Sequence, residues 1–195
     1  MDGRRLPLSM NDRKQQAAQL EIRRCAFELF LKSGYAETTV DEIAEAAGIS
    51  RRTFFRYFDT KEDVVIVALH LGGETLEELL RNRPRDEGPC ISTQKALADL
   101  LVHFQTTSDR TWEILNLIQT NPKLRARFLL EREGWSSRIQ SVLVERGTPE
   151  LRAALISHIA GGVLTHVYEL WHADRNLDPG AAVDEAFATL ESLYR

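Results

Sequence analysis

Apolar residues recur at intervals of three and four along almost the whole chain, and this spacing restricts the fold more than any other feature of the sequence. Such a repeat places apolar side chains on one face of an α-helix, whereas a β-strand needs alternation at every second residue. No segment alternates as a strand would. One clear stripe within residues 18–30 consists of Ala18, Ile22, Cys25, Ala26, Leu29 and Phe30. The sequence therefore predicts an all-α fold.

Capping and turn residues divide the first third of the chain into three helices. Gly34 follows the first helix at the position where a left-handed residue commonly ends a helix. Thr39 and Glu42 form a T-x-x-E capping box that opens a short second helix, which Gly48 ends. Ser50 is placed to cap a third helix directly after the turn. We therefore expect two short helices joined by a tight turn.

Later capping signals predict a longer helical region. Thr60 and Asp63 repeat the capping pattern for a helix that runs to Arg83, and residues 83–92 are expected to form a loop. A capping residue stands before a proline at Asn121-Pro122, Thr148-Pro149 and Asp178-Pro179. These pairs mark helix starts and bring the helices expected after the loop to about five. The predicted domains are a flexible tail over 1–12, a three-helix helix-turn-helix domain over 13–60 and a helical domain over 61–195.

The net charge of the chain is −4, and its positive charge is concentrated in one short segment. Residues 1–61 contain 11 basic and 9 acidic residues, whereas the rest of the chain contains 14 basic and 20 acidic residues. Between Ser50 and Tyr57 there are three arginines and no acidic residue. A surface for an anionic partner such as nucleic acid is therefore predicted on one helix rather than over a broad face.

The third predicted helix has the composition of a DNA-reading helix. Two short helices joined by a tight turn can place the second one in the major groove of DNA. Ile49, Phe54 and Phe58 are spaced to hold this helix against its domain, and the side chains left facing outward are Arg51, Arg52, Thr53 and Arg56. Arginine can donate two hydrogen bonds to guanine, and hydroxyl groups suit phosphate. An arginine-rich helix can also be a plain solvated face, so the whole motif is needed for the assignment.

From Gly34 to Val64 the sequence resembles the TetR family of bacterial transcriptional regulators. The resemblance is carried by the run I-S-R-R-T-F-F-R-Y-F, which starts at Ile49, and by the T-K-E that starts at Thr60. It implies contacts with the bases or the backbone of double-stranded DNA for Thr39, Ser50, Arg51, Arg52, Thr53, Phe55, Arg56, Tyr57 and Lys61.

At three of these positions the residue present changes the contact that is expected. Phe55 stands where many members of the family carry a tyrosine whose hydroxyl meets phosphate, so its ring is expected to pack on sugar instead. Arg52 stands where relatives often carry glycine or proline, and it is expected to add a base contact in exchange. Tyr57 is expected to form a partly buried wall rather than to read a base.

The second half of the chain is expected to bind a ligand and to form a homodimer. The resemblance from residue 69 onward is architectural, and it implies a helical domain whose last two helices build a four-helix interface with a second copy. Residues 150–173 support this, because one apolar stripe with Leu151, Leu155 and Ile159 is joined by a second apolar side. A helix that is apolar on two sides needs a packing partner on each of them. A monomer whose own core covers both sides is the alternative.

An aromatic-rich set in this half supplies the candidate ligand site. Such side chains can line an apolar cavity that has a few polar groups, although each can also be an ordinary core residue. The candidates are His103, Phe104, Trp112, Leu115, Phe128, Trp135, His166 and Trp171. The ligand expected is small and apolar or amphipathic. The second half is also similar to a subgroup of the family from actinobacteria, and that similarity implies a long acyl ligand.

The sequence gives little support for a metal site, a catalytic site or a membrane span. Cys25 and Cys90 stand too far from other ligands for zinc spacing, and packing is the expected role of Cys25. Glu169 and His172 have the spacing of half a di-iron site, but the partners that such a site needs are missing. No catalytic residue, metal or cofactor is expected, because no phosphate-binding loop or nucleophile motif occurs. No apolar run is long enough for a membrane span, and a cytoplasmic location is expected.

The predicted function is a dimeric repressor that binds a near-palindromic operator and leaves it when ligand enters the second domain. One alternative is a regulator that answers to no ligand, or an activator that acts through a partner protein. The other is a helical-bundle metalloenzyme.

Overall fold

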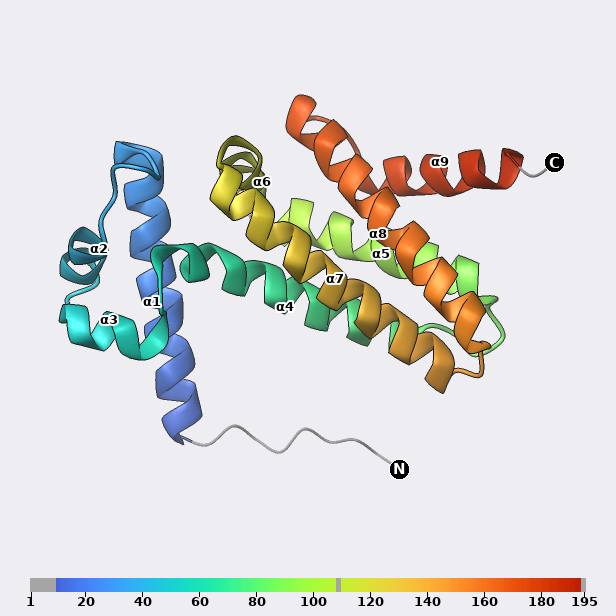
Figure 1. The fold of residues 1–195 in the computed structure, drawn as a ribbon, viewed down its shortest axis with the longest axis horizontal. Coiled ribbons are helices and arrows are strands. Elements are labelled where there is room, and N and C mark those ends of the chain that lie inside the picture. The colour runs from blue at the N-terminus through green and yellow to red at the C-terminus, as the bar shows by residue number, and fades with distance from the viewer. Residues whose placement is uncertain (1–9, 108–109, 194–195) are drawn as a thin grey trace. The chain divides into compact units, whose positions relative to one another are not determined.

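The computed structural model describes residues 10–107 and 110–193, and it confirms an all-α fold for them, with no strand (Figure 1). The helices of these residues are α1 (Met10–Ser33), α2 (Val40–Ala46), α3 (Arg51–Tyr57), α4 (Lys61–Asn82), α5 (Pro89–Thr107), α6 (Arg110–Thr120), α7 (Pro122–Glu145), α8 (Glu150–Ala173) and α9 (Pro179–Ser192). None of them is long and apolar enough to cross a membrane.

Contacts between Cα atoms divide the chain into two compact units, with the boundary between Val65 and Ile66. The first unit contains α1, α2, α3 and the first residues of α4, and the second contains the rest of α4 and α5 to α9. The boundary therefore falls inside one helix, a few residues after the predicted start of the second domain at residue 61. Both units thus share α4.

The first unit is built around a small aromatic and aliphatic core. Phe27, Phe30, Ile43 and Phe54 are buried, and the rings of Phe27 and Phe30 meet edge to face. Cys25 is buried as well, and its thiol donates to the backbone oxygen of Ala46 at 3.4 Å. The packing role expected of Cys25 is therefore confirmed. Burial of these side chains fixes α1, α2 and α3 against one another.

The second unit is a helical bundle in which α7 packs along α8 and α5 packs along α9. Its core includes Leu97, Leu101, Leu143 and Val167, all fully buried. Ion pairs add to this packing between α4 and α7, where Glu77 meets Arg138 at 2.7 Å and Arg81 meets Glu145 at 2.9 Å. Arg138 holds the pKa of the Glu77 carboxyl below its ordinary value by hydrogen bonding. These contacts seat α4 on the bundle.

Three predicted boundaries differ from the structure. The loop expected over residues 83–92 is shorter, because α5 starts at Pro89, whose missing N–H is no loss at a helix start. Helix α8 starts at Glu150, so Pro149 is the cap and the Thr148 side chain makes no cap hydrogen bond. A flexible tail was expected over residues 1–12, and residues 1–9 of it lie outside the described residues. The described part differs from this expectation, because α1 already begins at Met10.

Candidate functional site

The turn between α2 and α3 has the geometry that the sequence predicts. Thr39 caps α2, since its hydroxyl accepts from the backbone N–H of Glu42 at 3.3 Å and the Glu42 carboxylate accepts from the backbone N–H of Thr39 at 2.7 Å. The Glu42 carboxylate accepts from both the backbone N–H and the hydroxyl of Thr39, and these two hydrogen bonds hold the pKa of Glu42 below its ordinary value. Gly48 has a φ of +64°, a left-handed conformation that favours glycine. The capping box and the glycine turn are therefore confirmed.

The third helix is capped at one end and anchored on one face. The Ser50 hydroxyl accepts from the backbone N–H of Thr53 at 3.1 Å, which confirms Ser50 as the cap of α3. Phe54 is fully buried and Phe58 is 3% exposed, with ring centres 5.7 Å apart. Ile49 is half-buried in the turn. This anchoring turns the opposite face of α3 to solvent.

The outward face of α3 is basic and partly hollow. Arg51, Arg52 and Arg56 are exposed, and Phe55 is 42% exposed, so its ring is available to pack on a ligand. A hollow of about 450 Å³ is lined by Arg52, Thr53, Phe55 and Arg56. The surface combines guanidinium groups, a hydroxyl and an apolar ring, which suits base edges, phosphate and sugar respectively.

The three arginines of α3 differ in their partners. The Arg51 guanidinium donates to the carboxylate of Asp41 at 2.6 Å and lies 5.4 Å from the centre of the Phe55 ring. The Arg56 guanidinium lies over the Tyr57 ring and donates to its hydroxyl at 3.0 Å. Arg52 makes no side-chain hydrogen bond or ion pair with the described residues. Of the three, Arg52 has its donors open to a base without giving up a partner.

Lys61 has a role in this unit that its sequence position does not reveal. Its ammonium donates to the backbone oxygens of Tyr35 at 2.7 Å, Ala36 at 3.1 Å and Thr38 at 2.8 Å, and it lies 4.6 Å from the centre of the Tyr35 ring. An ammonium has three hydrogens, and all three are used here. Lys61 therefore ties the start of α4 to the segment between α1 and α2. Its expected contact with DNA stays a prediction.

Release of Arg51 from Asp41 is expected to strengthen DNA binding. In Asp41→Asn the guanidinium of Arg51 loses its carboxylate partner and becomes free to neutralise a phosphate. We expect the slope of log K against log salt to steepen by about 0.9, the change for one added phosphate contact. Fluorescence anisotropy with labelled duplex DNA at several salt concentrations measures this slope.

Glu45→Gln is the matched control for Asp41→Asn, because it removes one exposed carboxylate from the same helix. We expect the control to leave the slope nearly unchanged. Equal slopes for the two variants would show that Arg51 gains no phosphate and that only the charge of the helix matters.

The structure distributes the predicted ligand residues over several places in the second unit. Leu115, Phe128, Trp135 and Trp171 are buried, Phe104 and Trp112 are half-buried, and His103 and His166 are exposed. Trp112 stacks on His172 with ring centres 6.2 Å apart, and Phe128 meets Tyr168 at 5.7 Å. Phe104 and Trp135 converge on Gly72 of α4. A shared ligand site for all eight stays a prediction.

The metal-binding alternative finds no support in the described part of the chain. Glu169 faces Arg125 at 3.8 Å, whereas His172 forms a hydrogen bond with the side-chain oxygen of Asn116 at 3.0 Å. No group of three or more His, Cys, Asp or Glu side chains there is placed to hold a metal ion.

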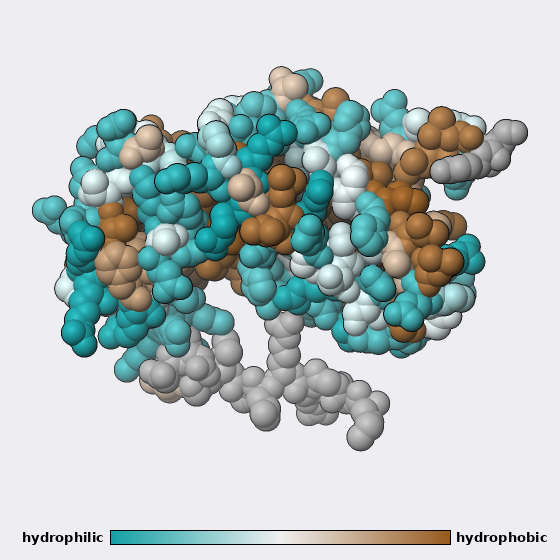
Figure 2. Space-filling view, in the orientation of Figure 1, coloured by the Kyte–Doolittle hydropathy of each residue, from teal (hydrophilic) through white to brown (hydrophobic). Residues whose placement is uncertain are grey.

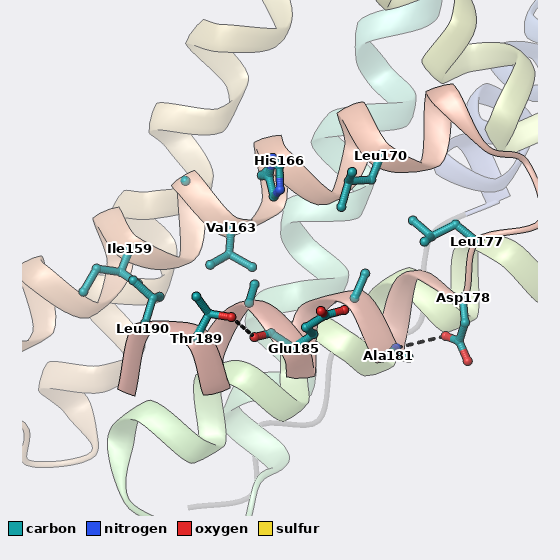
Figure 3. A pocket seen from close by; sticks show the side chains of 13 residues that line it. Ile159, Val163, His166, Leu170, Leu177, Asp178, Ala181, Glu185, Thr189 and Leu190 are labelled. Atoms are coloured by element: carbon teal, nitrogen blue, oxygen red, sulfur yellow. Dashed lines mark hydrogen bonds between the residues drawn. The ribbon is translucent and has the colours of Figure 1, made fainter. Parts of the chain in front are cut away.

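A groove of about 680 Å³ runs between α8 and α9 (Figure 3). Its walls are mostly apolar, and its lining residues are Ile159, Gly162, Val163, His166, Leu170, Leu177, Asp178, Ala181, Ala182, Glu185, Ala186, Thr189 and Leu190. His166 is the one candidate ligand residue among them. Figure 2 shows hydrophobic side chains gathered over this part of α8 and α9.

Sequence reasoning missed Asp41 and the glycine pair at residues 72 and 73. The Asp41–Arg51 pair joins residues ten positions apart, and no spacing rule within one helix indicates it. Gly72 and Gly73 did offer a signal, because adjacent glycines inside a predicted helix are costly and call for a packing reason.

A capped, anchored pair of short helices with an arginine-bearing outward face, followed by a separate helical unit, defines a helix-turn-helix DNA-binding protein. The family profile for bacterial regulatory proteins of the tetR family matches residues 22–68, and the profile for the MftR C-terminal domain matches residues 91–195. The chain belongs to the TetR family of bacterial transcriptional regulators. It is a DNA-binding transcriptional regulator, and the resemblance drawn from its sequence is confirmed.

Individual relatives agree with this assignment. The chain is 29% identical over 143 residues to the transcriptional regulator TcmR of Streptomyces glaucescens, covering 70% of this chain and 63% of TcmR. It is 28% identical over 182 residues, 90% of each protein, to MftR of Mycobacterium tuberculosis, named as a regulator of mycofactocin biosynthesis. Among solved structures, FadR of Bacillus subtilis in complex with stearoyl-CoA matches with a TM-score of 0.60 and 18% identity over 88% of this chain and 96% of FadR.

Proposed function

We propose that the chain is a homodimeric repressor that binds a near-palindromic operator and leaves it when a small apolar or amphipathic molecule enters the second unit. Residues 13–60 are assigned to DNA and residues 61–195 to ligand and dimer contacts. The observation that carries the proposal is the outward face of α3, where Arg52 has no partner among the described residues and lines a hollow with Phe55. Because its proposed target is chromosomal DNA, we place the protein in the cytoplasm and assign it no enzymatic role.

The apolar surface of α8 supports a second copy as the occupant of the α8–α9 groove. Leu151 is 75% exposed, Leu155 57% and Ile159 42%. Leu151 and Leu155 lie beyond the groove, so the apolar surface extends along the helix further than a small molecule needs. A continuous exposed apolar face of this kind marks a protein interface. Two copies of α8 and α9 would cover it as a four-helix bundle.

Gly162 supports the same occupant. It lies inside α8 and is exposed, and a Cβ built on it meets nothing within 4 Å. Glycine in the interior of a helix costs about 1 kcal/mol relative to alanine, and no packing within the described part of the chain offsets that cost. Close approach of a second helix at this point would explain why glycine is present there.

A dimer built on one two-fold axis presents two copies of α3 to DNA. Such a pair binds half-sites that repeat in inverted orientation, with recognition helices in major grooves about one helical turn or a multiple apart. The operator is therefore proposed to be near-palindromic.

An acyl thioester is the effector class that the comparisons favour. FadR of Bacillus subtilis was solved with stearoyl-CoA, and FadR of Thermus thermophilus was solved with lauroyl-CoA. Ligand would act as a population shift, since it favours the conformer to which it binds more tightly. Helix α4 belongs to both units, so a change in its seating on the bundle reaches the DNA-binding unit.

Selection of bound sites from random duplex DNA tests the proposed function. We expect the full-length protein to enrich an inverted repeat, and stearoyl-CoA to lower its affinity for that repeat. A selection that returns no shared sequence, or a direct rather than an inverted repeat, would contradict a symmetric DNA-binding dimer. If an inverted repeat is enriched but stearoyl-CoA does not change the affinity, the symmetric DNA-binding dimer stands and only the proposed effector class is wrong.

Substitution of Arg52 tests which side chain reads a base. A bidentate contact with guanine contributes about 1–3 kcal/mol of discrimination, so Arg52→Ala is expected to relax the sequence preference at one position by about tenfold or more. Arg52→Lys keeps the charge but cannot form the fork, and it is expected to lose the preference while retaining affinity for random DNA. Competition binding with operator variants measures both, and an unchanged preference in both variants would assign base reading elsewhere.

A further inference from the structure

Two adjacent glycines create a bare notch in the middle of α4. A Cβ on Gly72 would lie 2.8 Å from Phe104 Cζ and 2.9 Å from Trp135 Cη2, and a Cβ on Gly73 would lie 2.7 Å from both Cδ1 and Nε1 of Trp135. Neither position has a left-handed φ, so the backbone does not require glycine there. The missing side chains therefore make room for the Phe104 and Trp135 rings to lie directly on the helix backbone.

The ring that fills this notch carries an unsatisfied donor. Trp135 is 3% exposed, and its indole N–H finds no hydrogen-bond acceptor among the residues that the structure describes. A buried donor without a partner is unfavourable, and Trp usually finds a partner for its N–H when it is buried. A phenylalanine or a leucine would fill an apolar notch without this cost. Helix packing alone therefore explains the glycines but not the indole.

We infer that Trp135 occupies the effector site of the ligand-free protein and that the effector takes its place in the notch at Gly72 and Gly73. This inference rests on the proposed ligand response. The notch accepts a flat or chain-like apolar group, because its floor is glycine backbone and Phe104 lies beside it. Once displaced, the indole N–H can reach an acceptor that it lacks inside the notch, and an apolar effector that also carries a carbonyl can supply one. An acyl thioester has both parts.

The position of the notch links it to DNA binding. Gly72 and Gly73 lie on the part of α4 that belongs to the second unit, and the same helix starts at Lys61 in the first unit. Exchange of an indole for a ligand at the notch changes how α4 is seated against α7. The two occupants thus define the two states that a population shift needs.

Two single-tryptophan proteins test the inference without any ligand. The chain has three tryptophans, so Trp112→Phe with Trp171→Phe leaves Trp135, and Trp112→Phe with Trp135→Phe leaves Trp171. Both remaining indoles are almost fully buried, at 3% and 2% exposure. If Trp135 leaves its notch intermittently, acrylamide should quench it several times more strongly than Trp171. Equal quenching would overturn the inference. Hydrogen exchange of the two indole N–H groups in the unsubstituted chain gives the same comparison.

Gly73→Ala tests the consequence for DNA. The added Cβ leaves no room for the indole, so we expect stronger quenching of Trp135 and about tenfold weaker operator binding without ligand. Gly134→Ala is the matched control, since a Cβ there meets nothing within 4 Å, and it should change neither quantity. A folded Gly73→Ala protein with a protected Trp135 and normal operator binding would overturn the inference. If this variant does not fold, the quenching comparison of the two single-tryptophan proteins tests the inference instead.

Stearoyl-CoA separates the inference from the proposed function. Added to the Trp135-only protein, it should increase quenching while it lowers operator affinity. Release of the operator with no change at Trp135 would overturn the inference and leave the proposed function standing. Absence of stearoyl-CoA binding by calorimetry would remove the proposed effector class, and the ligand-free comparison would still decide the place of Trp135.

Discussion

Ile159→Glu is expected to yield a monomer that no longer holds its operator. Ile159 lies on α8, is 42% exposed and lines the groove opposite Leu190 of α9 (Figure 3). In a dimer built on this groove, each copy would bury a carboxylate against apolar side chains, and a buried unpaired charge is strongly unfavourable. Because the side chain faces solvent in the single chain, the fold of the monomer should survive.

The loss of operator affinity follows from the loss of the second half-site. When two binding modules are linked, binding of the second is intramolecular, and the gain in avidity is about 100- to 10,000-fold. The variant should lose this factor on the full operator and keep its affinity for a half-site. Sedimentation velocity gives the oligomeric state, and anisotropy with full and half operators gives the affinities.

Leu130→Glu is the matched control for Ile159→Glu. Leu130 is 63% exposed on α7 and does not line the groove. We expect this variant to remain a dimer with normal operator binding. If Ile159→Glu also remains a dimer, the groove between α8 and α9 is not the interface.

Lys61→Met is expected to destabilise the DNA-binding unit by about 3 kcal/mol, because three carbonyls lose a charged donor. Each such hydrogen bond contributes about 1.5–3 kcal/mol, but Lys61 is only half-buried, so water replaces the donor in part and the total falls below the sum of the three. The three carbonyls belong to Tyr35, Ala36 and Thr38, in the segment between α1 and α2. Methionine keeps most of the length of the side chain, so the loss reports on the ammonium. Urea unfolding followed by circular dichroism and native-state hydrogen exchange of residues 35–38 measures the change.

Salt dependence separates this structural role from a contact with phosphate. If Lys61 serves only to hold the three carbonyls, the slope of log K against log salt should not change in folded Lys61→Met. A slope that is shallower by about 0.9 would instead show that Lys61 neutralises one phosphate. Lys32→Met removes another lysine of the first unit, an exposed one, and should cost only a few tenths of a kcal/mol, as expected at a helix C-terminus.

Short-range signals in the sequence are enough to define the helix-turn-helix. Its defining contacts join residues that are close in the chain, such as Thr39 with Glu42 and Ser50 with Thr53, and such contacts follow from residue type and spacing. The turn at Gly48 and the buried face of α3 follow from equally local rules. For the same reason, the motif was sufficient to identify the family.

Which donors of the side chains on these helices stay open to DNA depends instead on tertiary contacts. Asp41 pairs with Arg51 from another helix, and Lys61 donates to carbonyls more than twenty residues earlier. Arg52 keeps its donors open, because it forms no side-chain hydrogen bond or ion pair with the described residues. The same holds for Trp135, whose partner surface is Gly72 and Gly73 on a distant helix. A sequence fixes which hydrogen bonds a side chain can make, but competition among partners that the fold brings together fixes which ones it does make.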